Sequence, residues 1–198
     1  MGVMVLKGLS VYEIRDMALK SGRSVFSPQQ LSNLIGRPKP VATVYMNRLV
    51  ARGLASRLMR GRIAFDADDF VIATQLVEPS YVSLDSALLF HGIIKQVTHN
   101  VECATTINSI VYGRLGIEYH KIPARLFLGY ERHSRGASYT FVATPEKALV
   151  DGLYLGMYSE ERFAELARGL DLEGMARMLE RFDGKGAARL KRVIGSLA

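Results

Sequence analysis

The chain has 198 residues, 48% of them hydrophobic, and a formal net charge of +7. This composition supports one large or two small packed domains and excludes a disordered chain. A single cysteine, Cys103, excludes a disulfide framework and a multi-cysteine zinc site, and no apolar run approaches the roughly 20 residues of a membrane helix. The first residues lack the pattern of a signal peptide, so we expect a cytoplasmic protein with no membrane partner.

Positive charge is concentrated near the N-terminus. Residues 1–65 contain eleven Lys or Arg against Glu13 and Asp16, a net charge of +9, whereas residues 66–198 have a net charge of −2. Between Arg37 and Arg62 there are seven basic residues and no acidic residue. Because a solvated surface normally mixes both signs, this run predicts a polyanionic partner.

The first two helices are marked by their capping residues. Ser10 and a glutamate three residues later form a capping box for a helix over residues 11–20, whose apolar side chains share one stripe. A second helix is predicted after Ser27, where a proline takes the first helical position, and it ends at Gly36. Residues 23–26 are interpreted as a short extended link between the two helices.

A third helix is predicted from Val41 to Arg52, with one apolar stripe facing inward. Its opposite face carries small and polar side chains instead of Glu/Lys pairs, which suits close approach to base edges in the major groove of DNA. The inward stripe is Ala42, Tyr45, Met46 and Leu49, and the opposite face is Thr43, Asn47 and Ala51, flanked by Val44 and Arg48.

A basic hairpin is predicted next, with strands over residues 54–59 and 62–65 around a tip at Arg60 and Gly61. Three helices followed by a hairpin within roughly 55 residues indicate a winged helix-turn-helix, and the charge predicts that it binds DNA. The alternative is a protein-interaction module whose basic hairpin is a solvated edge. We expect Thr43, Asn47 and Arg48 to read bases, and Lys39, Arg57, Arg60 and Arg62 to neutralise phosphates.

The charge reverses at Asp66, which is expected to end the hairpin and mark a domain junction. A helix from Asp69 to about Leu76 should follow. The predicted domains are therefore residues 1–67, which bind DNA, and residues 68–198, a regulatory domain.

Within the second domain, residues 96–142 are rich in β-branched and aromatic residues and predict strands, with a basic hairpin tip at 132–136. Thr144 and the proline after it mark a helix start, and three further helical patterns follow, over 160–170, 172–182 and 187–197. The predicted fold class is α+β: an N-terminal winged helix-turn-helix, then a mixed α/β C-terminal domain that ends in helices.

Patterns that would indicate catalysis are weak. The four histidines are scattered, and the chain has no HExxH motif or glycine-rich phosphate loop. Asp85 with the segment Glu118 to Lys121 is the nearest match to a metal-dependent nuclease, but strand alternation places Glu118 and Lys121 on opposite faces. We therefore expect no enzyme, no catalytic residue, no metal and no cofactor, and keep a nuclease as the less favoured alternative.

Asp151 lies among apolar residues of the helix that follows Thr144. An unpaired charge would be costly there. We expect Asp151 to form an ion pair with Arg114 or Arg125 of the strand region, or to cap a backbone group.

Three features together resemble a known family: the basic hairpin, residues 78–93 (EPSYVSLDSALLFHGI) and residues 141–155 (FVATPEKALVDGLYL). From about Ser10 to Tyr158, the chain resembles the antitoxin and transcriptional-regulator family of the abortive-infection E (AbiE) systems.

The resemblance implies the antitoxin of a type IV toxin–antitoxin operon used in phage defence. Such a protein represses its own promoter by binding inverted repeats in double-stranded DNA, and it counteracts a nucleotidyltransferase toxin. Two-fold symmetric sites would require two copies of the chain, as in a dimer on DNA. A stand-alone winged-helix regulator with the same architecture is the alternative that the sequence leaves open.

Overall fold

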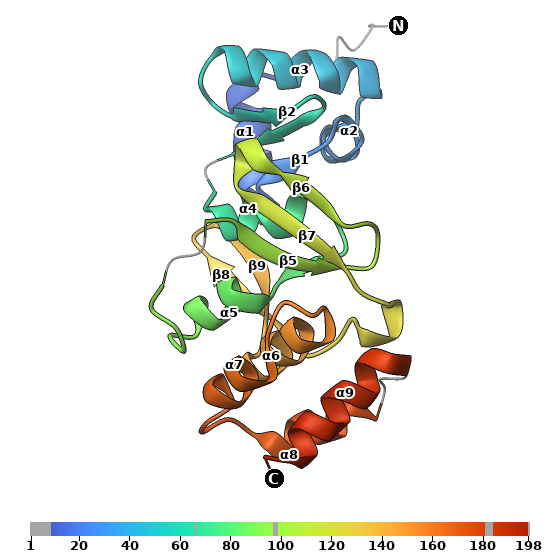
Figure 1. Ribbon diagram of the computed structural model, residues 1–198. Helices are drawn as coiled ribbons and strands as arrows, with labels where there is room; N and C mark the ends of the chain where they lie inside the picture. The colour runs from blue at the N-terminus through green and yellow to red at the C-terminus, as the bar shows by residue number, and fades with distance from the viewer. Residues whose placement is uncertain (1–8, 66, 97–98, 181–183, 198) are drawn as a thin grey trace, which may run out of the picture. The chain divides into compact units, whose positions relative to one another are not determined.

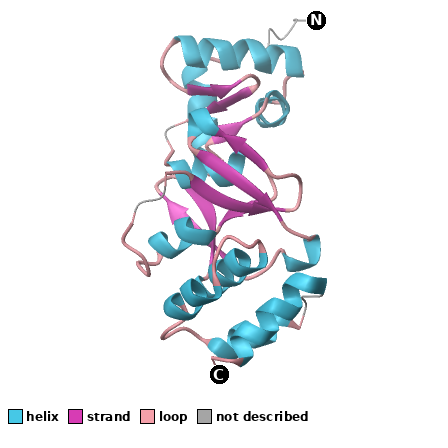
Figure 2. Ribbon diagram, in the orientation of Figure 1, coloured by secondary structure: helices cyan, strands magenta, loops and turns pink. Residues whose placement is uncertain are grey.

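The computed structural model describes residues 9–65, 67–96, 99–180 and 184–197. The protein is a mixed α+β protein, as the sequence predicts. Its helices and strands are drawn in Figures 1 and 2. The chain divides into two compact units. The first unit comprises the residues up to Leu76 together with residues 134–139, and the second unit comprises the rest.

In the first unit, helices pack around a small antiparallel sheet with the strand order β1-β3-β2. The short link predicted over residues 23–26 contains a strand, because Val25 and Phe26 pair with Ala64 and Ile63. The elements are α1 (Val11–Lys20), β1 (Val25–Phe26), α2 (Pro28–Ile35), α3 (Lys39–Ala51), β2 (Ser56–Met59), β3 (Arg62–Ala64) and α4 (Asp69–Leu76).

The predicted helix caps of α1 and α2 are confirmed. The backbone N–H of Glu13 donates to Ser10 Oγ at 3.1 Å, and the Ser10 N–H donates to Glu13 Oε2 at 2.7 Å. Ser27 and Gln30 form the same reciprocal pair at the start of α2. Gly36 ends α2 with φ 61°, a left-handed conformation that glycine adopts at little cost.

Helix α3 packs on the core through the predicted stripe. Ala42, Met46 and Leu49 are buried in one cluster with residues of α1, α2 and β3, and Tyr45 is half-buried. The helix begins at Lys39, two residues before the predicted start, because the proline at position 40 fits its first turn. The core thus holds one face of α3 and leaves the opposite face in solvent.

Helix α4 belongs to the first unit, so the units divide after Leu76 instead of at the expected boundary between residues 67 and 68. Gln75 explains this, because its buried amide is satisfied within that unit. Gln75 Oε1 accepts from the N–H groups of Ser24 and Val25, and its Nε2 donates to Ser138 Oγ and the Tyr139 carbonyl at 3.0 and 3.1 Å. Asp66, where the charge reversal is predicted, lies outside the described residues.

The second unit is built on a mixed sheet with the strand order β6-β7-β5-β4-β9-β8, of which residues 134–139, the end of β8 and the start of β9, are assigned to the first unit. β4 pairs antiparallel with β5 and parallel with β9, while β7 runs parallel to β5 and antiparallel to β6. The strands are β4 (Ser80–Val82), β5 (Val101–Thr105), β6 (Ile110–Tyr112), β7 (Ile117–Lys121), β8 (Tyr130–Arg135) and β9 (Ser138–Ala143). The helices are α5 (Leu84–Phe90), α6 (Pro145–Tyr154), α7 (Glu160–Leu166), α8 (Leu172–Leu179) and α9 (Gly184–Gly195), with 3-10 turns at Gly113–Leu115 and Ala124–Leu126.

The predicted start of α6 is confirmed, because the Thr144 side chain accepts from the Lys147 N–H. Ser159 and Asp171 likewise cap α7 and α8. The expected helix over 172–182 ends at Leu179, and residues 181–183 lie outside the described residues. β4 is a strand that the sequence analysis does not predict, and its three buried residues pair with β5 and β9.

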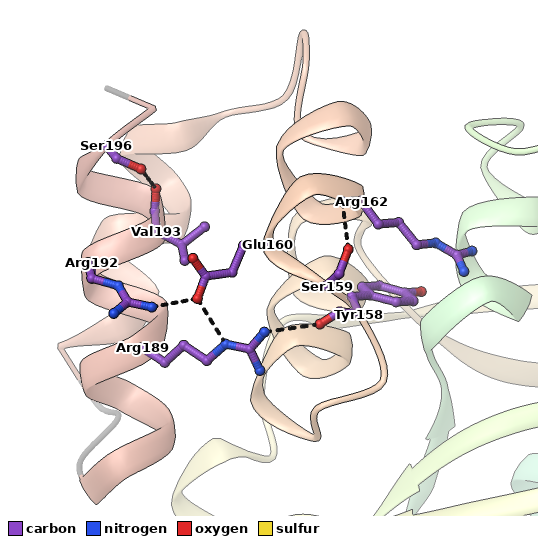
Figure 3. Close-up of polar contacts among 8 residues, drawn as sticks. All are labelled: Tyr158, Ser159, Glu160, Arg162, Arg189, Arg192, Val193 and Ser196. Atoms are coloured by element: carbon purple, nitrogen blue, oxygen red, sulfur yellow. Dashed lines mark hydrogen bonds and ion pairs between the residues drawn. The ribbon is translucent and has the colours of Figure 1, made fainter.

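Ion pairs join the last helices of the second unit. Glu160 Oε1 of α7 accepts from Arg192 at 2.5 Å and from Arg189 at 3.3 Å, both on α9 (Figure 3). Arg189 also donates to the carbonyl of Tyr158 at 3.4 Å. In the described parts of the chain, no helix has the length and apolar character needed to cross a membrane.

Candidate nucleic-acid interface

The basic residues predicted to bind DNA lie on α3 and on the β2–β3 hairpin, which are neighbours in the first unit (Figure 1). Seven residues are predicted to contact DNA, counting the polar Thr43 and Asn47 with the five basic ones, and six of them are exposed. The seventh, Arg62, is half-buried and donates to the Gly61 carbonyl at 3.1 Å. Within the described residues, no ion pair forms at any Lys or Arg between Arg37 and Arg62. Their charge is therefore available to an external anion.

A hydrogen bond links α3 to the β2–β3 hairpin. Arg57 of β2 donates to Asn47 Oδ1 of α3 at 2.7 Å, and both side chains are exposed. The sequence assigns Arg57 to phosphate contacts and Asn47 to base contacts, as separate tasks. The structure brings these two residues together, so the Arg57 guanidinium lies beside the amide that would face the bases.

Two other side chains of α3 are constrained by their own helix. The Thr43 hydroxyl donates to the Lys39 carbonyl at 3.0 Å, so its proton is already engaged and its methyl group remains as an apolar contact. The Arg48 guanidinium lies 5.7 Å from the centre of the Tyr45 ring, a cation–π contact that restricts its reach. Hydrogen bonds from the exposed face of α3 to an external molecule would therefore depend most on Asn47 and on Arg57, which is bonded to it.

The exposed face of α3 also carries apolar side chains. Val41 is 40% exposed and Val44 is 47% exposed, although both belong to a helix that already buries an apolar stripe elsewhere. The sequence prediction treated Val44 as a flank of the polar face and gave Val41 no role. The sequence contains a signal for these exposed valines, because a helix that is apolar on both its core face and its solvent face departs from ordinary amphipathic patterning.

A second candidate site is a cavity of about 480 Å³ in the second unit. Asp85 at its wall accepts from Arg162 at 2.7 and 2.9 Å and from the Tyr158 hydroxyl at 2.7 Å. Burial, with a contribution from the nearby Asp85 charge, raises the pKa of Glu102 to about 7. The cavity is lined by Asp85, Ile94, Gln96, His99, Asn100, Glu102, Glu118 and Arg162.

The cavity brings together part of the weak nuclease pattern. Asp85 and Glu118 both line it, whereas Lys121 is exposed at the end of β7. His120 Nε2 lies 3.7 Å from Glu118 Oε1, and burial lowers the pKa of His120. Among the residues that the structure describes, no group of three His, Cys, Asp or Glu side chains is arranged to hold a metal ion.

The expectation that Asp151 pairs with Arg114 or Arg125 is wrong. Its partner is Lys147, four residues earlier on α6, and both side chains are buried. Asp151 Oδ2 also accepts from the hydroxyl of Tyr81 at 2.9 Å and from that of Ser83 at 2.8 Å. Spacing of a lysine and an aspartate by one helical turn could have indicated this pair, because such residues are neighbours on a helix.

These bonds form a buried polar cluster of Tyr81, Ser83, Lys147 and Asp151. Burial, together with the Asp151 charge, raises the pKa of the Tyr81 hydroxyl well above its ordinary value. Ser83 stands at the N-cap position of α5, but its hydroxyl makes no capping bond and donates to Asp151. The cluster is closed to solvent, so its geometry indicates a structural role within the second unit.

No protein-family model matches this chain, and a comparison with curated proteins also gives no match. The likeness to AbiE antitoxins therefore stays a prediction made from the sequence.

Proposed function

We propose that this chain is a transcriptional repressor that binds double-stranded DNA through α3 and the β2–β3 hairpin. The observation that carries the proposal is the exposed basic surface of these two elements, whose cations have no acidic partner among the described residues. A duplex carries about one negative charge per 1.7 Å of its axis, so such a surface gains affinity by releasing counterions. The element order α1-β1-α2-α3-β2-β3 supports a winged helix-turn-helix as the DNA-binding unit.

In this proposal the two elements have different tasks. Helix α3 enters the major groove, where Thr43, Asn47 and Arg48 face base edges. Lys39 and the hairpin residues Arg60 and Arg62 neutralise phosphates and fix the position of the helix. Arg57, held by Asn47, belongs to both sets. Recognition of an inverted repeat would use two copies of the chain.

The test is the salt dependence of DNA binding. Replacing both hairpin residues, Arg60→Ala with Arg62→Ala, should weaken binding to all sequences alike and flatten the slope of log K against log salt by roughly two. Mobility shifts on DNA from upstream of the gene, at several salt concentrations, measure this slope. The matched control is Arg168→Ala with Lys191→Ala, which removes two exposed cations of the second unit. An unchanged slope, or an equal change in the control, would contradict the assignment of the hairpin.

We further propose that the repressor is the antitoxin of an AbiE-like type IV system and counteracts a nucleotidyltransferase toxin. The support is the resemblance of residues 78–93 and 141–155. These segments contribute Tyr81, Ser83, Lys147 and Asp151 to the buried cluster, so the resemblance concerns the core of the second unit. Co-expression with a nucleotidyltransferase encoded beside the gene tests the proposal, because the full chain should restore growth.

A metal-dependent nuclease is the second candidate function, and one observation favours it. Asp85 and Glu118, which are distant in sequence, line the same cavity. Incubation of the protein with plasmid DNA and Mg²⁺ or Mn²⁺ separates this function from repression. Cleavage that Glu118→Ala abolishes would support the nuclease, whereas intact plasmid together with a mobility shift would support the repressor.

A further inference from the structure

The exposed valines of α3 form a small apolar patch within a basic surface. Val44 lies one helical turn from Val41 and from Arg48 and three residues from Asn47, so these side chains are neighbours on the helix surface. Val41 and Val44 are 40% and 47% exposed, and the Thr43 methyl group adds to them because the Thr43 hydroxyl is bonded to the helix backbone. The patch is thus made of methyl groups next to one amide.

The surroundings of the patch determine what could cover it. Its neighbours are cations without acidic partners in the described chain, so charge complementarity selects an anionic partner over an ordinary apolar protein surface. Two valines without Trp, Phe or Leu are a poor anchor for a lipid surface. The major groove of DNA offers both phosphates and an apolar group, the C5 methyl of thymine.

We propose that α3 selects thymine at one position of its DNA site, with Val44 contacting the C5 methyl group. This inference rests on the proposed DNA-binding function and specifies the class of sequence that the same surface reads. Val44 supplies the apolar contact, and Asn47, three residues further along α3, supplies a hydrogen bond to a neighbouring base. The recognised DNA site therefore contains an A·T base pair whose thymine lies under Val44.

The test removes the methyl group from the DNA without changing base pairing. The full chain first selects its preferred sites from duplexes randomised over about 20 base pairs, two helical turns. Each thymine of a selected site is then replaced singly by deoxyuridine, which pairs with adenine but lacks the methyl group. At the position under Val44, the wild-type affinity should fall about fourfold, as expected for losing one buried methyl group.

The variant Val44→Ala shows whether that loss is due to this side chain. It should bind the thymine site about fourfold more weakly than the wild type and lose nothing further with deoxyuridine at the same position. Alanine is a strong helix former and Val44 is exposed, so the variant should fold normally. The matched control is Val111→Ala, the same change at an exposed residue of the second unit, which should respond to deoxyuridine as the wild type does.

Three results would overturn the inference. One is equal affinity for thymine and deoxyuridine at every position, and another is a Val44→Ala variant that keeps the full deoxyuridine loss. A third is binding to vesicles of phosphatidylserine that Val44→Ala abolishes, because the patch would then serve a lipid surface. If no DNA is enriched at all, the proposed function fails as well, so the two failures are distinguishable.

Discussion

Helix α3 leaves its basic side chains in solvent without acidic partners among the described residues, whereas helix α6 buries a lysine and an aspartate against each other. The charges of Lys147 and Asp151 in α6 are satisfied within the chain, by one another and by the hydroxyls of Tyr81 and Ser83. The charged side chains of α3 form no ion pair among the described residues. A buried pair that is fully bonded indicates structure, and an exposed surface of one sign indicates a partner. Substitutions in the two helices should therefore affect different measurements.

The largest expected effect is on stability and comes from α6. Lys147→Met should lower the free energy of unfolding by about 3–5 kcal/mol, because it leaves the Asp151 carboxylate buried without its cation. Urea denaturation measures this loss. The control Lys191→Met, at an exposed residue of α9, should have little effect.

A second variant separates the ion pair from general disruption. Lys147→Met combined with Asp151→Leu should recover much of the lost stability, because it removes both charges from the buried cluster. Any folded fraction of either variant should keep the salt slope of DNA binding. If Lys147→Met lost as little stability as the control Lys191→Met, the buried ion pair would not stabilise the second unit and the proposed difference between α3 and α6 would be wrong.

The next effect is on DNA recognition and comes from the bond between Asn47 and Arg57. Asn47→Ala should relax specificity at one base position, and its combination with Arg57→Ala should cost less than the sum of the single losses. The expected coupling is about 0.5–1 kcal/mol, typical of neighbouring side chains that share an interaction. Binding isotherms for the two single variants and the double variant measure it.

The comparison pair for this cycle is Asn47→Ala with Arg60→Ala, in which Arg60 lies at the hairpin tip. These two losses should add, because no bond joins Asn47 and Arg60 among the contacts of the described residues. Strict additivity for the Asn47 and Arg57 pair would show that their hydrogen bond plays no part in recognition. An equal loss for every DNA sequence on Asn47→Ala would remove α3 as the reading element.

The last expected effect is a pH dependence of stability in the second unit. Burial raises the pKa of Glu102 from 4.5 to about 7, so the folded state binds this proton more tightly than the unfolded state does. The resulting stability is present below pH 4.5 and is lost as the pH rises through about 7. Glu102→Gln should flatten this decline in the urea midpoint.

His120 has the opposite effect on how stability depends on pH in the same region. Its pKa is lowered by burial, so its contribution to stability is lost as the pH falls. Comparing Glu102→Gln with wild type at each pH isolates the carboxyl group, because the histidine is unchanged. A wild-type midpoint that rises between pH 5 and about 7, and a variant that follows it, would contradict the assignment to Glu102.

The sequence by itself determined the features that depend on near neighbours along the chain. The capping boxes at Ser10 and Ser27, the cap of Thr144 and the buried stripe of α3 follow from residues within one or two helical turns of each other. The α+β class and the basic character of α3 and the hairpin were predictable for the same reason, since both follow from composition and local periodicity.

Only the tertiary structure decided which distant residues meet. β1 and β4 are two and three residues long, too short for an alternating pattern, and they become strands because partners remote in sequence supply their hydrogen bonds. Tyr81 and Ser83 reach Asp151 across 70 and 68 residues. The link between Asn47 and Arg57 and the cavity around Asp85 likewise require the folded chain, because side chains far apart in sequence become neighbours only after the helices and strands have packed.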